Sequence, residues 1–351
     1  WALHRGGAIF VEGASFVNIS ANAFTRVDAN GILLSGWTRY VTIELNSFQY
    51  IGDSAMAAWG YTEEHDGTGQ EQPRYTTVEG NVAHEVGIYQ LQSAMWFQAK
   101  TALTTIRGNV FFNGPRSGIN LNDGFGGGTN ISHNLIFNQC RHSGDHGPIN
   151  TWERQPFLTD VRTGKPSWQP APTSIFRNFI IANYGGSQGV DNDDGSSWYS
   201  IHHNYFYGEG LKMDYGGHDS EYYSNVNVVH RYDGQNCINV WGFRPGYEHR
   251  FYNNTCAMLF KDHYGDLQGC RPDNLDASVC ANVMGDKGAQ CVPTMLHNSY
   301  YTPNGTALML CANKQIPLSE LQKHGIEQGS TEASLPSDDE IVEWGRQILG
   351  L

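Results

Sequence analysis

The residues of this chain that are best suited to acid–base chemistry are aspartates in two short segments, VDNDDG (190–195) and GLKMDYG (210–216). We predict that four of them form the catalytic group: Asp191, Asp193, Asp194 and Asp214. Paired carboxyl groups about 5 to 9.5 Å apart hydrolyse glycosidic bonds by acid and base or nucleophilic steps. Because such close carboxylates cannot all ionise freely, at least one is expected to stay protonated and serve as the acid.

The same cluster has two other interpretations. Oxygen-rich Asp and Asn clusters bind Ca²⁺, and the ligands would then be Asp191, Asp193 and Asp194. DNDDG is also typical of a solvated turn. The sequence contains no CxxC or HExxH spacing of the zinc kind. We therefore expect no required cofactor, with Ca²⁺ as the one metal left open.

Ten further residues, polar or aromatic, are predicted to contact a sugar substrate: Asn122, Asp123, Asp145, His146, Trp152, Glu153, Arg154, Lys212, His218 and Trp241. Trp152 and Trp241 offer flat apolar rings on which sugar rings can stack. A lone histidine is more often structural than functional, but His146 and His218 each stand beside an aspartate. We expect both histidines to contact substrate or move a proton.

Composition restricts the class of partner. The 351 residues carry 22 Lys and Arg against 35 Asp and Glu, a net charge of -13. Nucleic acid is therefore an improbable partner, because phosphate contacts need cations, and a neutral polysaccharide fits better than an acidic one. The chain has no run of 18 apolar residues, so the sequence predicts no membrane span. Hydrophobic residues make up 39%, which can supply a sizeable core.

An internal repeat organises the elements that must position these residues. A short pattern of an apolar residue, two variable residues, an asparagine and an apolar pair recurs mostly every 21 to 29 residues. Its asparagines are Asn22, Asn46, Asn81, Asn109, Asn134, Asn178, Asn204, Asn225, Asn254 and Asn298. Short apolar runs between Gly and Asn turns at this period predict a β-solenoid. We expect each asparagine to adopt left-handed backbone geometry and to bond its equivalent in the next coil.

A second column follows each asparagine and predicts which side chains face outward. Alternation along a strand places Ile119 and Leu121 inside the solenoid and Asn120 and Asn122 outside. In the preceding coil the alignment places Met95 and Phe97 inside and Trp96 outside as a further aromatic platform. Neighbouring coils lie about 4.8 Å apart, so Asp193 and Asp214 are expected to be stacked neighbours.

Cysteines and sequons indicate an oxidising compartment. Six of seven cysteines are predicted to form disulfides, with 15 pairings left open: Cys237, Cys256, Cys270, Cys280, Cys291 and Cys311. Cys140 is expected to be a reduced thiol in a coil interior. Four Asn-X-Ser/Thr sequons are candidate glycosylation sites: Asn18, Asn130, Asn253 and Asn304. Together with a start at Trp1, these features predict a segment of a longer protein that is secreted or displayed at the cell surface.

The segments GINLNDGFGGG, CRHSGDHGPINTWERQPF, VDNDDGSSWY and GLKMDYGGHD resemble right-handed parallel β-helix proteins related to pectate lyases and to β-helix glycoside hydrolases. The resemblance covers roughly residues 1 to 260. It implies an all-β, right-handed solenoid whose acid–base residues are paired aspartates on the outer face of one sheet. By position these are Asp191, Asp193, Asp194 and Asp214. Lyase relatives instead use an Arg or Lys base with Ca²⁺ bridging a uronate, for which Lys212 and Arg154 are the placed cations.

The C-terminal part is expected to differ from the coils. We predict β-helix coils over residues 1–260, a disulfide-rich segment with a last coil over 261–317, and a tail with a capping helix over 318–351. Ser337 followed by Glu340 forms a capping box. The apolar face of that helix, which includes Ile341 and Trp344, is expected to cover the last coil.

The leading functional hypothesis is a secreted glycoside hydrolase that acts on a polysaccharide or other glycan. One alternative is a structural or adhesive module that joins other chains of an extracellular assembly. Another is a Ca²⁺-dependent polysaccharide lyase.

Overall fold

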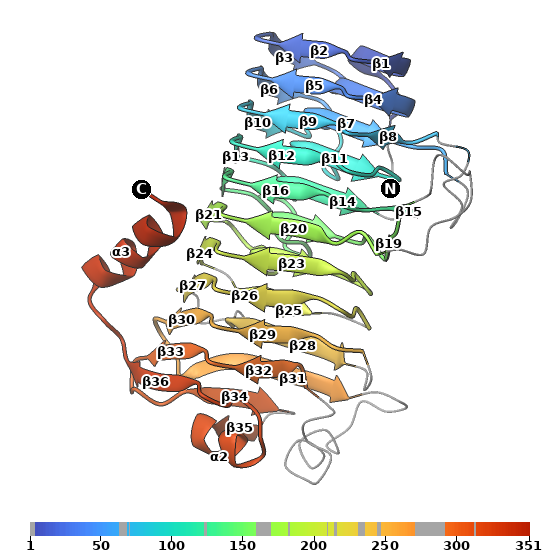
Figure 1. Cartoon of the computed structure of the whole chain (residues 1–351). Helices are drawn as coiled ribbons and strands as arrows, with labels where there is room; N and C mark the ends of the chain where they lie inside the picture. The colour runs from blue at the N-terminus through green and yellow to red at the C-terminus, as the bar shows by residue number, and fades with distance from the viewer. Residues whose placement is uncertain are drawn as a thin grey trace. The chain divides into compact units, whose positions relative to one another are not determined.

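The computed structural model describes residues 4–62, 69, 71–122, 125–158, 170–181, 183–208, 210–213, 216–230, 236–243, 247–270, 292–311 and 314–351. The chain divides into two compact units, residues 1–187 and 188–351, which are called unit 1 and unit 2. Each unit is built almost entirely of parallel strands (Figure 1). The predicted boundaries at residues 260 and 317 are not tested by this division and stay predictions.

Unit 1 contains three parallel sheets to which each coil adds one strand in turn. The first sheet has the order β1 (Gly7–Ser15), β4 (Asn30–Arg39), β7 (Met56–Trp59), β11 (Trp96–Ala99), β14 (Ile119–Asn122) and β18 (Ile149–Thr151). The second has β2 (Asn18–Ser20), β5 (Thr42–Glu44), β9 (Thr77–Glu79), β12 (Thr105–Arg107), β16 (Asn130–Ser132) and β20 (Thr173–Phe176). The third has β3 (Ala23–Val27), β6 (Ser47–Ile51), β10 (Val82–Val86), β13 (Val110–Phe112), β17 (Leu135–Phe137) and β21 (Phe179–Ile181). The short strand β8 (Pro73–Arg74) pairs with β4.

Unit 2 repeats this three-sheet arrangement. Its first sheet has the order β22 (Val190–Asn192), β25 (Leu211–Met213), β28 (Ile238–Phe243), β31 (His263–Cys270), β34 (Leu308–Cys311) and β35 (Lys314–Pro317), the last being antiparallel. The second has β23 (Tyr199–His202), β26 (Glu221–Tyr223), β29 (Arg250–Tyr252) and β32 (Thr294–Leu296). The third has β24 (Tyr205–Tyr207), β27 (Val226–Val229), β30 (Thr255–Met258), β33 (Ser299–Thr302) and β36 (Thr331–Ser334). The mostly-β class and the solenoid-like stacking agree with prediction, whereas the right-handed sense of the coils remains a prediction.

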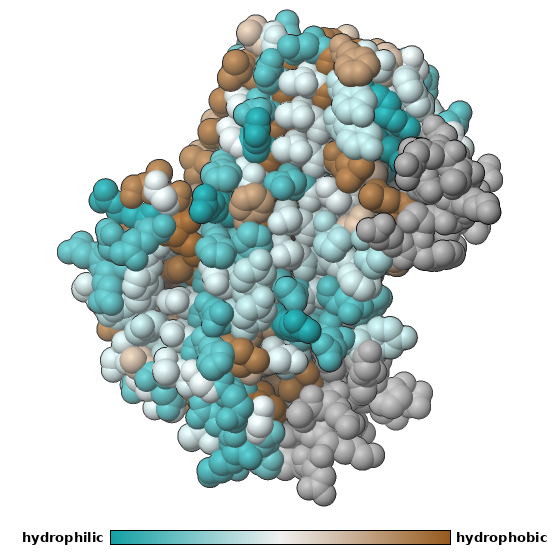
Figure 2. Space-filling view, viewed as in Figure 1, coloured by the Kyte–Doolittle hydropathy of each residue, from teal (hydrophilic) through white to brown (hydrophobic). Residues whose placement is uncertain are grey.

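Alternation along three-residue strands separates the core from the surface. In the second sheet of unit 1 the middle residues Ile43, Val78 and Ile106 are fully buried, while their neighbours in the strands point away from the core. The apolar middle residues of successive coils therefore stack inside the solenoid. Figure 2 shows the outer face of the second sheets, where hydrophilic and near-neutral residues predominate.

The repeated asparagines form a ladder in each unit. Asn81 illustrates the pattern: its main-chain N and its Nδ2 both donate to Oδ1 of Asn109, at 2.9 and 3.0 Å. Its Nδ2 also donates to the carbonyl oxygen of Ile43. The ladder of unit 1 runs through Asn22, Asn46, Asn81, Asn109, Asn134 and Asn178, and that of unit 2 through Asn204, Asn225, Asn254 and Asn298. The predicted stacking is confirmed.

The expected left-handed geometry of these asparagines is wrong, because the residue before each one adopts it. Leu45, His133 and Asn253 have φ values of 55°, 58° and 54°, and each directly precedes a ladder asparagine. That preceding residue makes the chain turn, which leaves the asparagine free to bond the next coil. The corner between the second and third sheets therefore always contains two residues, a left-handed one and the ladder asparagine.

The predicted register of one coil is wrong by one residue. Trp96, not Met95, pairs with Met56 and Ile119, so the fully buried Trp96 points into the core. Its Nε1 donates to Oε1 of Gln98 at 2.9 Å. Phe97 is consequently on the outer face, where it packs in an apolar cluster with Leu33 and Ala57. Trp96 is thus a core residue and not a sugar platform.

The glycine-rich segment after β14 serves close backbone packing. Strand β15 (Phe125–Gly126) pairs with β19 (Gln155–Pro156) in a separate two-stranded ladder. A Cβ on Gly126 would lie 1.8 Å from the carbonyl oxygen of Thr101, and one on Gly127 would lie 2.7 Å from that of Ala171. Only glycine permits this approach.

The cysteine-rich part of unit 2 contains one disulfide within the described residues, between Cys237 and Cys256. Cys311 is also disulfide-bonded. Cys280 and Cys291 lie outside the described residues, and for Cys270 only the backbone is described. In unit 1, Cys140 is a buried thiol whose Sγ donates to the carbonyl oxygen of His146, as predicted.

Two helices lie among the described residues of unit 2 (Figure 1). Helix α3 (Asp338–Leu349) begins as predicted, since Ser337 Oγ accepts from the main-chain N of Glu340 at 3.3 Å. It packs mainly on β24 and β27, where the main-chain oxygen of Ile341 accepts from the Tyr205 hydroxyl. It also meets the last coil, since the Trp344 ring lies 4.9 Å from that of Tyr301 on β33. The last coil is joined as well by β35 and by α2 (Leu318–Lys323), whose Leu318 and Leu321 are buried.

Candidate functional site

A buried ion pair occupies the outer face of the first sheet in unit 2. Asp191 and Lys212 are register neighbours on β22 and β25. Lys212 Nζ lies 2.8 Å from Asp191 Oδ1 and 3.4 Å from Asp193 Oδ1. The Asp191 side chain is fully buried and that of Lys212 is 5% exposed, whereas Asp193 retains 14%. One ammonium group thus contacts two of the predicted catalytic carboxylates, and Asp193 is the one with access to solvent.

An aromatic ring and two polar residues extend this face. Lys212 Nζ lies 5.4 Å from the centre of the Trp241 ring. Asn239 pairs in register with Lys212 on one side and with Asp266 on the other. Asn239 and Asp266 were not among the predicted site residues, although both occupy the outward column that contains Asp191 and Lys212.

The other two predicted catalytic aspartates differ from this pair. Asp194 is exposed in the turn after β22, and its main-chain N donates to Asp193 Oδ1 at 3.1 Å. Asp214 lies outside the described residues, as does the predicted substrate residue Asp123.

His218 belongs to an aromatic group beside the second sheet of unit 2. Its Nδ1 lies 2.6 Å from Asp219 Oδ2, so a neutral ring would donate from Nδ1 and keep Nε2 as an acceptor. The ring also meets Trp198 edge to face at 6.2 Å and lies 5.2 Å from Tyr247. Trp198 and Tyr247 were not among the predicted residues, although Trp198 follows Asp194 by only four positions.

Unit 1 contains a second polar group, formed by the loops that precede β14 and β18 of its first sheet. His146 is 2% exposed, and its ring nitrogens contact the guanidinium of Arg116, a residue absent from the sequence prediction. Asp145 is largely exposed, with Oδ2 3.3 Å from His146 Nδ1. The His146 ring meets that of Trp152 edge to face at 5.6 Å. This arrangement places the predicted residues Asp145, His146 and Trp152 together.

The remaining predicted residues of unit 1 have different environments. Glu153 is buried and its Oε2 accepts from the Thr173 hydroxyl at 3.2 Å. Arg154 is exposed, and Asn122 is buried at the end of β14. Glu153 is therefore better suited to a structural role than to contact with a substrate.

Within the described part of the chain, no three His, Cys, Asp or Glu side chains converge as a metal ion would need. Asp191 and Asp193, two of the candidate Ca²⁺ ligands, contact Lys212, and a Ca²⁺ site stays a prediction. None of the described helices is long and apolar enough to cross a membrane.

No protein-family model and no curated protein sequence matches the chain. Among solved structures, one described as a glycoside hydrolase is similar, with a TM-score of 0.43 and 17% sequence identity. The alignment covers 68% of this chain and 38% of that hydrolase, so the chain spans well under half of its length.

Proposed function

We propose that this protein is a glycoside hydrolase whose reactive groups lie on the outer face of the first sheet of unit 2. The observation that supports this best is the placement of Lys212 between Asp191 and Asp193, beside the Trp241 ring. It combines a positioned carboxylate, a hydrogen-bond donor for sugar hydroxyls and an apolar ring, which are the groups that a glycan site needs.

The burial of each group suggests its role in this proposal. Asp191 is fully buried and paired, so it would fix Lys212 and not meet substrate. Asp193 would be the nucleophile or base, because it is partly exposed and is held by Lys212 and by the main-chain N of Asp194. The acid would be Asp194 or Asp214. Trp241 would stack on a sugar ring.

The test is turnover of a panel of polysaccharides, followed as release of reducing ends. Asp193→Asn is expected to lower kcat by about 10²-fold or more, the usual contribution of a positioned acid or base, with an unchanged Tm. Asp194→Asn and Asp214→Asn identify the acid. The matched control is Asp28→Asn, which changes an exposed aspartate of unit 1. Full activity of all three site variants would refute the assignment.

Secretion is part of this proposal, and the disulfide supports an oxidising compartment. Asn253 and Asn304 are exposed at their sequons, as is Asn18, whereas Asn130 is half-buried on β16. Expression in a eukaryotic secretory host should therefore give glycan occupancy at the three exposed sites, measured by mass spectrometry.

One observation favours the adhesive alternative. The rings of Phe16, Tyr40 and Tyr75 stack at 5.1 and 4.9 Å on the surface of unit 1, where Phe16 is 79% exposed. Such an apolar column can bury itself against another chain. If the protein is an assembly module, no glycan is cleaved and Phe16→Ser prevents self-association in sedimentation experiments. A Ca²⁺-dependent lyase would instead release unsaturated, ultraviolet-absorbing products and lose activity with chelator.

A further inference from the structure

Four polar side chains near the polar group of unit 1 carry atoms without hydrogen-bond partners in the protein. The atoms are Ser117 Oγ, Asn120 Nδ2, Asn122 Oδ1 and Asn150 Nδ2. Their residues are 1%, 2%, 9% and 1% exposed. An unsatisfied buried polar group costs about 1 to 3 kcal/mol, so four in one short region are expensive unless a ligand meets them.

The register of the first sheet brings the central pair together. Asn120 on β14 pairs with Asn150 on β18, which places their Cα atoms about 4.8 Å apart. Since Ile119, Leu121 and Ile149 are fully buried in the core, alternation directs both asparagines to the outer face. Two amide N–H donors thus lie side by side.

Apolar rings flank this pair. Phe97 is the register neighbour of Asn120 on β11. On the opposite strand, the main-chain N of Trp152 donates to the carbonyl oxygen of Leu121 at 2.8 Å, which sets Trp152 beside Asn122. Amide groups next to aromatic rings suit a ligand with hydroxyl groups on one edge and C–H groups on its face.

From these contacts we propose that Ser117, Asn120, Asn122 and Asn150 form a binding subsite for a neutral sugar ring. The donor and acceptor inventory selects this class: the two Nδ2 atoms need acceptors, whereas Asn122 Oδ1 needs a donor. Hydroxyl groups both donate and accept, but carboxylate and sulfate groups only accept. A uronate also carries hydroxyl groups, but none of these four side chains is cationic, so its carboxylate would be buried here without a counter-charge. The subsite therefore prefers neutral sugars to uronates, which deepens the proposed carbohydrate function.

The test measures binding without turnover. The protein carries Asp193→Asn throughout, and calorimetry compares neutral hexose and pentose tetrasaccharides with a galacturonate tetrasaccharide. We expect at least one neutral tetrasaccharide to bind, the uronate to bind at least 10-fold more weakly, and Asn120→Leu or Asn150→Leu to weaken neutral binding at least 10-fold. Both leucine variants should keep or raise Tm, because an apolar residue of similar shape removes an unsatisfied amide.

The control is Asn227→Leu, which removes another fully buried amide without partners, on the third sheet of unit 2. It is expected to leave binding unchanged. The inference is overturned if no neutral tetrasaccharide binds, if the uronate binds equally well, or if the leucine variants at 120 and 150 bind normally. Loss of binding in these variants without any turnover by the wild type would sustain the subsite and refute only the hydrolase proposal.

Discussion

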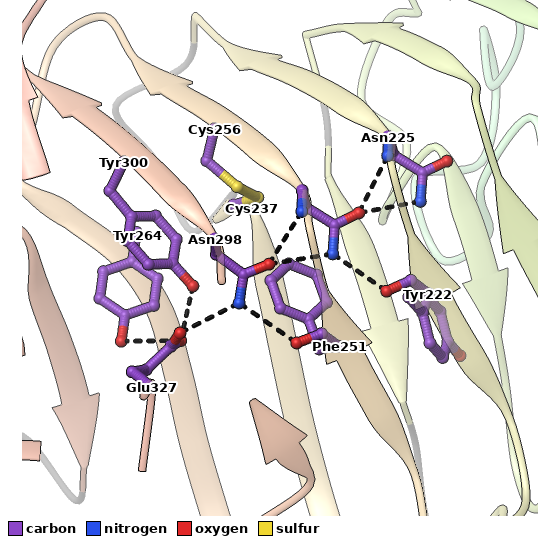
Figure 3. Close-up of a disulfide and its surroundings, with 10 residues drawn as sticks. Tyr222, Asn225, Cys237, Phe251, Cys256, Tyr264, Asn298, Tyr300 and Glu327 are labelled. Atoms are coloured by element: carbon purple, nitrogen blue, oxygen red, sulfur yellow. Dashed lines mark hydrogen bonds between the residues drawn. A yellow bond between two sulfur atoms is a disulfide. The ribbon is translucent and has the colours of Figure 1, made fainter. Parts of the chain in front are cut away.

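Asn298 donates its side-chain amide to Glu327 Oε2 at 3.0 Å, where a further coil would have supplied another asparagine. Its main-chain N donates to Ser330 Oγ, so Ser330 and Glu327 together replace one ladder residue. Figure 3 shows this end of the ladder, with the Tyr264 and Tyr300 hydroxyls also directed at Glu327. The acid thus satisfies donors that the repeat leaves behind, and burial raises the pKa of Glu327.

Replacing this acid should destabilise unit 2. Glu327→Ala would leave the donors of Asn298, Ser330 and Tyr300 without an acceptor inside the protein. We expect a loss of about 3 to 5 kcal/mol in the free energy of unfolding, measured by urea titration. Glu343→Ala, on the exposed face of α3, is the control and should cost under about 1 kcal/mol. An equal loss in both variants would contradict the role of Glu327.

The stability of unit 2 should fall between pH 6.5 and pH 4. Burial lowers the pKa of His249 to about 4, and the neutral ring accepts from the main-chain N of Ser220 and donates to the carbonyl oxygen of Gly217. Below pH 6.5, His249 binds a proton in the unfolded chain but stays neutral in the folded protein, so acid favours unfolding. The effect amounts to about 3 kcal/mol. His249→Gln should flatten this dependence in urea titrations at pH 7 and pH 4, and an identical slope would disprove it.

The ladder should contribute strongly at any interior coil. Asn109→Ala would remove an acceptor from Asn81 and a donor to Asn134, and would leave the carbonyl oxygen of Val78 without this partner. We expect a loss of about 2 to 4 kcal/mol. The control is Asn18→Ala, which removes an exposed side-chain bond to Glu44 at 3.2 Å and should cost under about 1 kcal/mol. Thermal unfolding of both variants decides the point.

Lys212 and Asp191 should behave as a coupled pair. Lys212→Met leaves the fully buried Asp191 carboxylate without its ammonium partner, which costs about 3 to 5 kcal/mol. Adding Asp191→Leu should restore part of that loss, since a buried pair can be replaced by apolar residues at little cost. A double-mutant cycle in urea measures the coupling. Simple additivity of the two losses would argue against the ion pair.

The disulfide should stabilise unit 2 independently of the ladder. Cys237 and Cys256 enclose a sequence separation of 19 residues, for which loop closure predicts about 3 kcal/mol. The double variant Cys237→Ser, Cys256→Ser should lose that amount in urea titrations. Cys140→Ser, which changes a buried thiol of unit 1, tests whether the loss is specific to the crosslink.

The repeat was predictable because each coil contains the same short sequence pattern: an apolar residue in the middle of a strand, followed by a turn and an asparagine. The register error at Trp96 arose because AMWFQA is apolar throughout, so alternation alone could not choose between Met95 and Trp96. The outward column of Asp191 and Lys212 was predictable from alternation. The ion pair between them was not predictable, because the partner of Lys212 depends on which carboxylate its side chain can contact across neighbouring strands. Arg116 was not predicted as a site residue, because it lies in a loop before β14 and belongs to none of the repeating columns.

The two-residue corner between the second and third sheets has a consequence for how such a chain can lengthen. Because these corners turn in the same way and interior ladder asparagines such as Asn81 and Asn109 make the same bonds, one interior coil is interchangeable with the next at this edge. Duplication of a whole coil, such as the segment from 82 to 109, would insert a module that needs no new corner. The length of the solenoid can then change by one coil at a time.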